Sequence, residues 1–161
     1  MKKVTKEIIF QVYNSQDELN AEITLLMQKA IEARKVAYAP YSNFLVGTAL
    51  LLENGEVIIG SNQENAAYPS GLCAERVAFF AAGANFPNIK IKAVAITATP
   101  RDRISSIPIP PCGACRQSMM EYEFRQNEAI PVYFMGGEGE VYLSSSVENL
   151  LPFVFESKFL N

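Results

Sequence analysis

Residues 44–60 decide the fold, and they run Phe-Leu-Val-Gly-Thr-Ala-Leu-Leu-Leu-Glu-Asn-Gly-Glu-Val-Ile-Ile-Gly. Two strand-like runs, 44–52 and 56–60, flank the pair Asn54-Gly55. An Asn-Gly pair tolerates positive φ at both positions, so it favours a tight turn between two strands. The stretch therefore predicts a β-hairpin.

A helix is predicted on the N-terminal side of this hairpin. Ser15-Gln16-Asp17-Glu18 fits a capping box, a serine with a glutamate three positions later. After it, apolar residues recur at steps of three and four, which is the spacing of one helix face. They are Leu19, Ile23, Leu26, Ala30, Ala33 and Ala37. Pro40 ends the predicted helix. Residues 5–13, on the N-terminal side of the capping box, favour a strand.

Strand and helix signals alternate on the C-terminal side of the hairpin. The expected elements are a helix from 69–71 to about 82, a buried strand over 93–99, a helix beginning near Cys112, strands over 130–135 and 140–143, and a short helix from Ser146. Alternating strands and helices with one hairpin imply an α/β fold in which helices pack on a mixed sheet. With no repeat or linker in the sequence, residues 1–161 are expected to form one domain.

Composition excludes several classes of protein. The chain has 161 residues, of which 49% are hydrophobic and 19% charged, and this is typical of a globular domain. The net charge is −3 and no basic stripe is present, so a nucleic-acid partner is not expected. No apolar run approaches the roughly 20 residues that span a bilayer. The basic segment 1–7 precedes an apolar run too short for a signal peptide, so we expect a cytoplasmic protein without a membrane partner.

Three cysteines and no histidine restrict the chemistry. The cysteines lie in two segments, Cys73-Ala74-Glu75-Arg76 and Pro111-Cys112-Gly113-Ala114-Cys115-Arg116, each predicted to open a helix. Helix N-termini favour anions, so the thiols are biased towards thiolate. Cys112 and Cys115 share one helix face, and Cys73 would complete three sulfur ligands for one zinc ion. Three protein ligands leave a coordination position for water, as in catalytic sites.

Two neighbours of Cys73 have predicted roles beside this metal. Glu75 could act as base and then as acid, moving protons from water to a leaving group. Arg76 could hydrogen-bond to sulfur and offset the charge of three thiolates. A C-x-x-C pair alone is also typical of a redox site or of a structural zinc site. A structural site would need a fourth ligand and would have no use for Glu75.

At these residues the chain resembles the small homotetrameric cytidine deaminases, from about Ala37 to Leu151. The resemblance rests on residues 38–44 (Tyr-Ala-Pro-Tyr-Ser-Asn-Phe), 62–68 (Asn-Gln-Glu-Asn-Ala-Ala-Tyr), both cysteine segments with Gln117, and Leu150-Leu151-Pro152. It implies a three-layer α/β/α fold with a central mixed sheet and one Zn²⁺ per chain. It also implies hydrolysis of cytidine and 2′-deoxycytidine to uridine and 2′-deoxyuridine plus ammonia, in pyrimidine salvage.

The resemblance also implies roles for individual residues. Cys73, Cys112 and Cys115 would hold zinc, and Glu75 would shuttle protons. The substrate contacts would be Asn62 and Glu64 on the ribose, Phe44 stacked on the base, backbone groups of Ala66 and Ala74 on the base edge, and Phe155 reaching into a neighbouring subunit. Phe153 is an alternative to Phe155, and residues 1–16 form an N-terminal extension of unknown role.

Two enzymatic alternatives stay open. One is the deamination of another aminopyrimidine, such as a nucleoside antibiotic like blasticidin S. The other is a polynucleotide deaminase, which the absence of a basic groove or an aromatic ladder disfavours.

Overall fold

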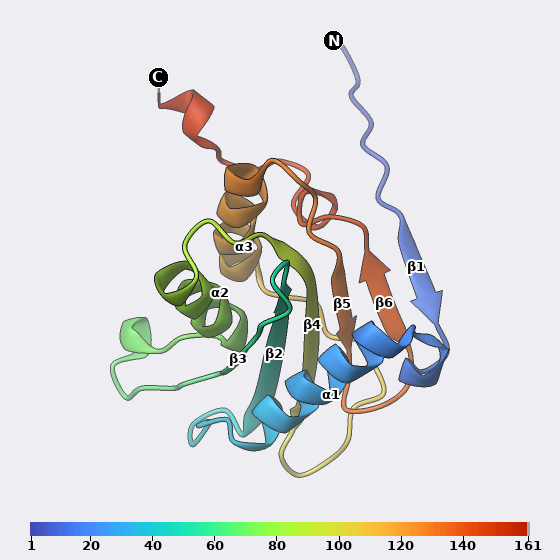
Figure 1. Cartoon of the computed structure of the whole chain (residues 1–161), viewed down its shortest axis with the longest axis vertical. Helices are drawn as coiled ribbons and strands as arrows, with labels where there is room; N and C mark the ends of the chain where they lie inside the picture. Colours follow the sequence, from blue (N-terminus) through green and yellow to red (C-terminus); the bar gives the residue numbers. More distant parts are fainter. Residues whose placement is uncertain (161) are drawn as a thin grey trace.

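A mixed β-sheet forms the centre of the molecule. The computed structural model describes residues 1–160, and within them six strands pair in the order β1-β6-β5-β4-β2-β3 (Figure 1). The strands are β1 (Phe10–Tyr13), β2 (Phe44–Leu52), β3 (Val57–Ser61), β4 (Ile91–Pro100), β5 (Val132–Met135) and β6 (Val141–Ser144). Strands β4 and β5 are parallel, whereas the other neighbouring pairs are antiparallel. The predicted mixed sheet is confirmed.

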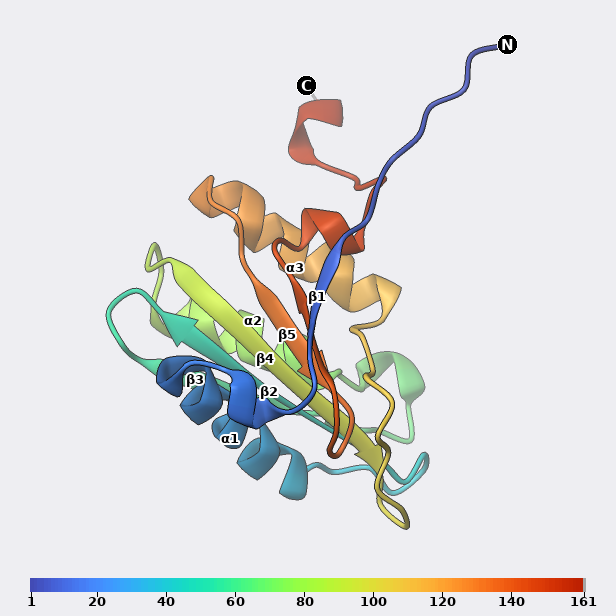
Figure 2. The ribbon, with the colours of Figure 1, turned by 90° about the vertical axis from the view of Figure 1, so that its right-hand side faces the viewer.

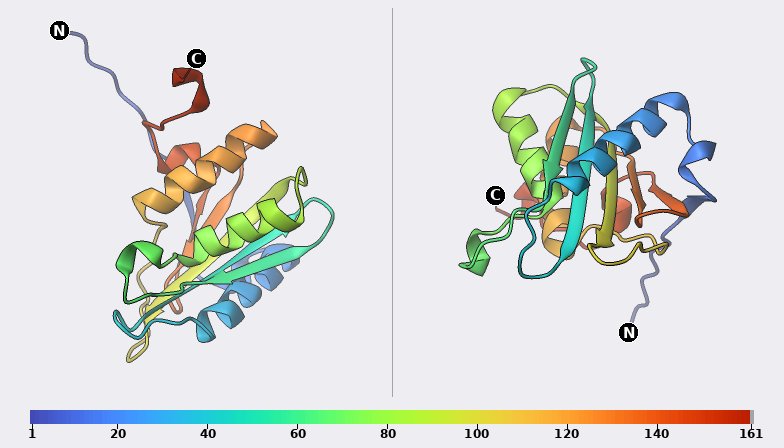
Figure 3. Two further views of the ribbon diagram at one scale, coloured as in Figure 1. Left: turned by 90° about the vertical axis from the view of Figure 1, so that its left-hand side faces the viewer. Right: turned by 90° about the horizontal axis from the view of Figure 1, so that it is seen from below.

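Helices cover both faces of this sheet. The described residues form three α-helices, α1 (Ala21–Lys35), α2 (Ala74–Asn85) and α3 (Gly113–Gln126). Short 3₁₀ segments lie at Gln16–Glu18, Tyr68–Ser70, Glu148–Leu150 and Ser157–Phe159. Helix α1 packs on one face, and α2 and α3 lie side by side on the other (Figures 2 and 3). The three-layer α/β/α arrangement is therefore confirmed. Among residues 1–160, no helix is both long and apolar enough to cross a membrane.

The predicted face of α1 is buried, but the predicted start of the helix is wrong. All six apolar positions of that face are at most 8% exposed. The side chain of Ser15 accepts from the Asp17 N–H, yet the helix that it caps is the 3₁₀ turn 16–18. Helix α1 begins at Ala21, where Asn20 Oδ1 accepts a hydrogen bond of 3.0 Å from the Ile23 N–H. Asparagine is a strong N-cap residue, so this second cap starts the long helix.

The hairpin is confirmed with a different turn. Strand β2 has the predicted bounds, and β3 is displaced by one residue. The Leu52 N–H donates to Glu56 O at 2.9 Å, which closes a loop of three residues. Within the Asn54-Gly55 pair only Gly55 has positive φ, at +88°. Three-residue hairpin loops place a left-handed residue at their last position, so glycine is needed there alone.

Two glycines let helices approach the sheet closely. A Cβ on Gly47 of β2 would lie 2.0 Å from Ala30 O of α1. A Cβ on Gly60 of β3 would lie 2.4 Å from Ala74 O, in the first turn of α2. Backbone contact at this range is possible only without a side chain. Gly60 therefore fixes where α2 begins relative to the sheet.

The remaining elements follow the sequence with shifted ends. Residues 68–70 form a separate 3₁₀ turn, so α2 begins at Ala74 and not at the predicted 69–71. Helix α3 begins directly after Cys112, as predicted. Strands β4, β5 and β6 overlap the predicted runs, and β1 occupies only the last part of residues 5–13.

Candidate active site

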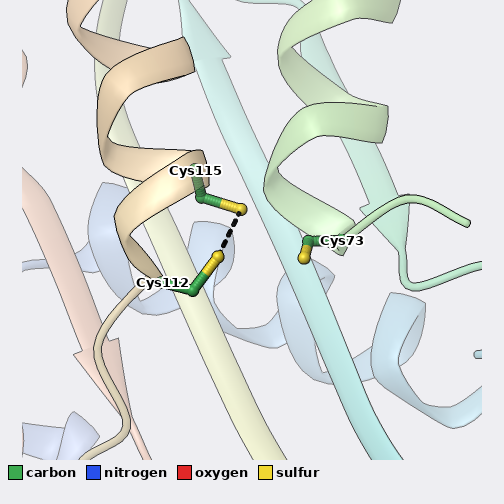
Figure 4. Close-up of side chains that lie close together, drawn as sticks. All are labelled: Cys73, Cys112 and Cys115. Carbon is green, nitrogen blue, oxygen red and sulfur yellow. Dashed lines mark hydrogen bonds between the residues drawn. The ribbon is translucent and has the colours of Figure 1, made fainter. Parts of the chain in front are cut away.

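Two helix N-termini bring the three cysteines together. Cys73 is the N-cap residue of α2, Cys112 is the N-cap residue of α3, and Cys115 lies in the first turn of α3. The three Sγ atoms lie within 4.8 Å of one another, and those of Cys112 and Cys115 are 3.5 Å apart. Figure 4 shows the side chains of Cys112 and Cys115 on one helix, with Cys73 on the helix beside it. The structure thus brings together the three ligands that the sequence predicted.

The sulfur cluster fits a zinc ion. Zn–S bonds of about 2.3 Å in a tetrahedral site place the sulfur atoms about 3.8 Å apart, within the range observed. Within residues 1–160, the cluster has three members and includes no fourth cysteine, histidine or carboxylate. Such a donor set leaves one tetrahedral position for water or substrate.

The electrostatics favour an anionic sulfur at Cys73. The pKa of its thiol is lowered to about 5, because Cys115 and then Arg76 hydrogen-bond to the sulfur, while burial opposes the shift. Arg76 Nη2 lies 3.9 Å from Cys73 Sγ, as the predicted charge-balancing role requires. The pKa of Cys115 is raised by the same hydrogen bond with Cys73 and by burial.

Glu75 is buried beside this cluster. It lies in the first turn of α2, two residues after Cys73, and is 4% exposed. Burial is the main cause that raises the pKa of its carboxyl group, and the negative charge of Cys73 adds to the effect. A carboxylate with a raised pKa accepts a proton more readily, which suits the base step of acid–base catalysis.

An open cleft of about 450 Å³ adjoins Cys73. Four predicted residues line it, namely Asn62, Glu64, Cys73 and Arg76. The remaining lining residues are Tyr41, Ser42, Gln63, Asn65, Tyr68, Gly71 and Leu72. The predicted metal ligand, the charge-balancing arginine and both predicted ribose contacts therefore face one space.

The other predicted substrate contacts do not line this cleft. Phe44 is the half-buried first residue of β2. Ala66 is exposed on the loop before Tyr68, whereas Ala74 is fully buried at the start of α2. Phe155 is 59% exposed, and its backbone N–H and C=O pair with the side-chain amide of Gln117 on α3. Their roles stay predictions.

Two features of the site were not singled out from the sequence. Tyr41 and Tyr68 both line the cleft, where their rings pack edge to face with ring centroids 6.0 Å apart. Arg116 donates to Pro111 O at 2.7 Å and to Leu150 O at 2.8 Å, which anchors the segment before α3. Its position directly after Cys115 was the available signal.

Comparisons with known proteins agree with this geometry. Residues 20–129 match the family model described as "Cytidine and deoxycytidylate deaminase zinc-binding region". A cytidine deaminase of Halalkalibacterium halodurans is 39% identical over 137 residues, covering 85% of this chain and 96% of the relative. A cytidine deaminase of Sporosarcina psychrophila is 39% identical over 140 residues, covering 87% and 96%. The crystal structure of cytidine deaminase from Burkholderia pseudomallei superposes with a TM-score of 0.71 and 41% identity, covering 81% of this chain and 97% of the other.

Fold and site together define a hydrolytic deaminase with a zinc-binding region. The α/β/α layers, the three-sulfur cluster and the buried carboxylate are the features that carry this class. The chain belongs to the cytidine and deoxycytidylate deaminase family.

Proposed function

We propose that this chain hydrolyses free cytidine and 2′-deoxycytidine to uridine and 2′-deoxyuridine, with release of ammonia. The observation that carries the proposal is a three-sulfur cluster beside a buried glutamate at an open cleft. The relatives named cytidine deaminase, which match most of this chain at 39% identity, support the same substrate.

The three cysteines would hold one zinc ion per chain. When bound, zinc supplies a Lewis acid that lowers the pKa of water to near neutrality. All three sulfurs would bind as thiolates, and Arg76, 3.9 Å from Cys73 Sγ, would offset part of their charge. The cluster therefore suits a divalent cation without needing a fourth protein ligand.

Glu75 does the proton transfer in this proposal. Its carboxylate takes one proton from the water that attacks C4 of the base and passes it to N3, and then takes the second proton of that water and delivers it to the departing amine. The oxygen of the water becomes the new carbonyl oxygen, and the C4–N bond breaks to release ammonia. Burial raises the pKa of Glu75, which makes its carboxylate a stronger base and so favours the uptake of a proton from the attacking water.

The cleft would bind the nucleoside. Asn62 and Glu64 offer amide and carboxylate groups to the ribose hydroxyls, and the carboxylate would repel a 5′-phosphate. Phe44 would stack on the base, with backbone groups of Ala66 and Ala74 at the base edge. Phe155 would complete the site of a neighbouring subunit.

We also propose the cellular setting of the enzyme. The chain would act as a single domain that assembles into a homotetramer, in the cytoplasm, within pyrimidine salvage. The exposed aromatic side chains of Phe153, Phe155 and Phe159, at 81%, 59% and 61%, support an assembly in which a partner covers this tail.

The test combines a metal analysis with a cytidine assay on wild type and Glu75→Ala. Wild type should contain one zinc per chain and should cause the loss of ultraviolet absorbance that follows deamination. Glu75→Ala should keep its zinc and fold but lose roughly 10²- to 10⁴-fold in kcat, because a positioned acid–base group contributes about this much. Glu121→Ala, an exposed glutamate on α3, is the matched control and should behave as wild type.

Three results would contradict the proposal. The first is full turnover by Glu75→Ala. The second is a wild-type chain that has no stoichiometric zinc and forms a reversible Cys112–Cys115 disulfide. The third is turnover of an antibiotic such as blasticidin S in preference to cytidine.

A further inference from the structure

Ser42 lies between two residues to which the proposed function assigns substrate contacts. Its hydroxyl donates a hydrogen bond to Glu64 Oε1 and accepts one of 3.0 Å from the Phe44 N–H. Ser42 is exposed at the cleft, in the turn that leads into β2. One hydroxyl thus connects the predicted ribose contact with the predicted base contact.

The same turn holds Glu64 by its backbone. Glu64 Oε2 accepts from the N–H groups of Tyr41, at 2.9 Å, and Ser42, at 3.3 Å. The hydrogen bond from the Ser42 side chain is the largest cause that lowers the pKa of Glu64, so the carboxylate stays ionised. A carboxylate has about four acceptor sites. Three are occupied by this turn, which leaves one on Oε1 for a ligand.

Asn62 is held in a similar way from the other side. Its Oδ1 accepts from the Val46 N–H at 2.8 Å, and its Nδ2 donates to Phe44 O at 2.9 Å. These bonds leave one N–H of the amide uncommitted. Glu64 and Asn62 both line the cleft, so an acceptor position on Glu64 and a donor on Asn62 stay available to a sugar hydroxyl.

We propose that Ser42 is a positioning residue that aims the Glu64 carboxylate at the ring hydroxyls of the sugar and makes the site selective for nucleosides that carry them. The inference rests on the proposed function, because Glu64 must contact the sugar. Without the Ser42 hydroxyl, Glu64 Oε1 loses the hydrogen bond that fixes its rotation, and part of the binding energy is spent on ordering it.

The experiment compares Ser42→Ala and Ser42→Thr with wild type on two substrates, cytidine and 2′,3′-dideoxycytidine, which lacks both ring hydroxyls. Ser42→Ala should raise KM for cytidine about ten-fold, equivalent to about 1.4 kcal/mol, with kcat within about two-fold of wild type. Its KM for 2′,3′-dideoxycytidine should change less than about two-fold. Ser42→Thr keeps the hydroxyl and should restore KM for cytidine to within about three-fold of wild type.

A matched control and a stability measurement exclude a general structural effect. Ser145→Ala removes the hydroxyl of an exposed serine between β6 and the turn 148–150, and should leave both KM values unchanged. The Tm of Ser42→Ala should stay within about 2 °C of wild type, because the side chain is exposed.

The outcomes separate this inference from the proposed function. If wild type does not turn over cytidine, the proposed function fails. If wild type turns it over, the inference is overturned by an unchanged KM in Ser42→Ala, by equal increases for both substrates, by a fall in kcat alone, or by loss of the fold.

Discussion

Two buried threonines on neighbouring strands should respond in opposite directions to the same substitution. Thr48 of β2 and Thr97 of β4 are both fully buried. Among the described residues, Thr48 Oγ1 has no hydrogen-bond partner. Thr97 Oγ1 donates to Gly136 O at 2.6 Å and also accepts from Arg34 Nη1. Replacing each with valine keeps the branched shape of the side chain and exchanges the hydroxyl for a methyl group.

The structure sets the sign and size of each effect. An unsatisfied buried polar group costs about 1–3 kcal/mol, so Thr48→Val should raise the free energy of unfolding by about 1 kcal/mol. Thr97→Val leaves the Gly136 carbonyl and the Arg34 guanidinium each with one bond fewer in a buried place. It should lower the free energy of unfolding by about 2 kcal/mol. In a protein of this size, each kcal/mol shifts Tm by roughly 2–4 °C.

Urea denaturation of the zinc-loaded proteins at one protein concentration measures both values. The slope m should be unchanged, so that the shift in midpoint reports stability alone. A lower midpoint for Thr48→Val, or a shift of both variants in the same direction, would show that partner satisfaction does not control the stability of these two sites.

Two further predictions concern the frame around the site. Gly60→Ala places a Cβ 2.4 Å from Ala74 O, so it should displace the first turn of α2, lower the zinc content per chain and cost about 3 kcal/mol by urea denaturation. Gly55→Ala is the control, because Gly55 has a φ of +88° and open space around the Cβ position. It should lower the free energy of unfolding by only about 1 kcal/mol and keep a normal zinc content. Equal zinc content in both variants would contradict the contact argument. Glu123→Gln should cost about 3 kcal/mol in the same assay, because the buried Glu123 carboxylate accepts from three backbone N–H groups and an amide cannot accept all three. A midpoint equal to that of wild type would refute this role.

Much of the fold was predictable because the signals were local. The apolar helix face and the strand 44–52 depend on spacing and residue type within one element, and the structure has both, although the helix spans only Ala21–Lys35 of the predicted Leu19 to Ala37. The start of α1 was not predictable in the same way. Both Ser15 and Asn20 can cap a helix, and only the extended backbone at Leu19 decides that Asn20 does so.

The residues of the site also fall into those that local sequence predicted and those that only the fold brings together. Cys112, Cys115 and the sequence Cys73-x-Glu75 were evident because ligands of one helix end are neighbours in the chain. The links of Ser42 to Glu64 and Phe44 were not predicted, since they join a turn to a loop that folds back onto it.

By itself, the sequence predicted which residues would bind zinc and transfer protons, because residue type and short spacing belong to the covalent chain. Only the tertiary structure decided that the N-termini of α2 and α3 meet with their three sulfur atoms within 4.8 Å. The physical reason is packing. Because Gly60 has no side chain, α2 packs closely against β3. This contact helps to set the distance from Cys73, at the start of α2, to the cysteines of α3.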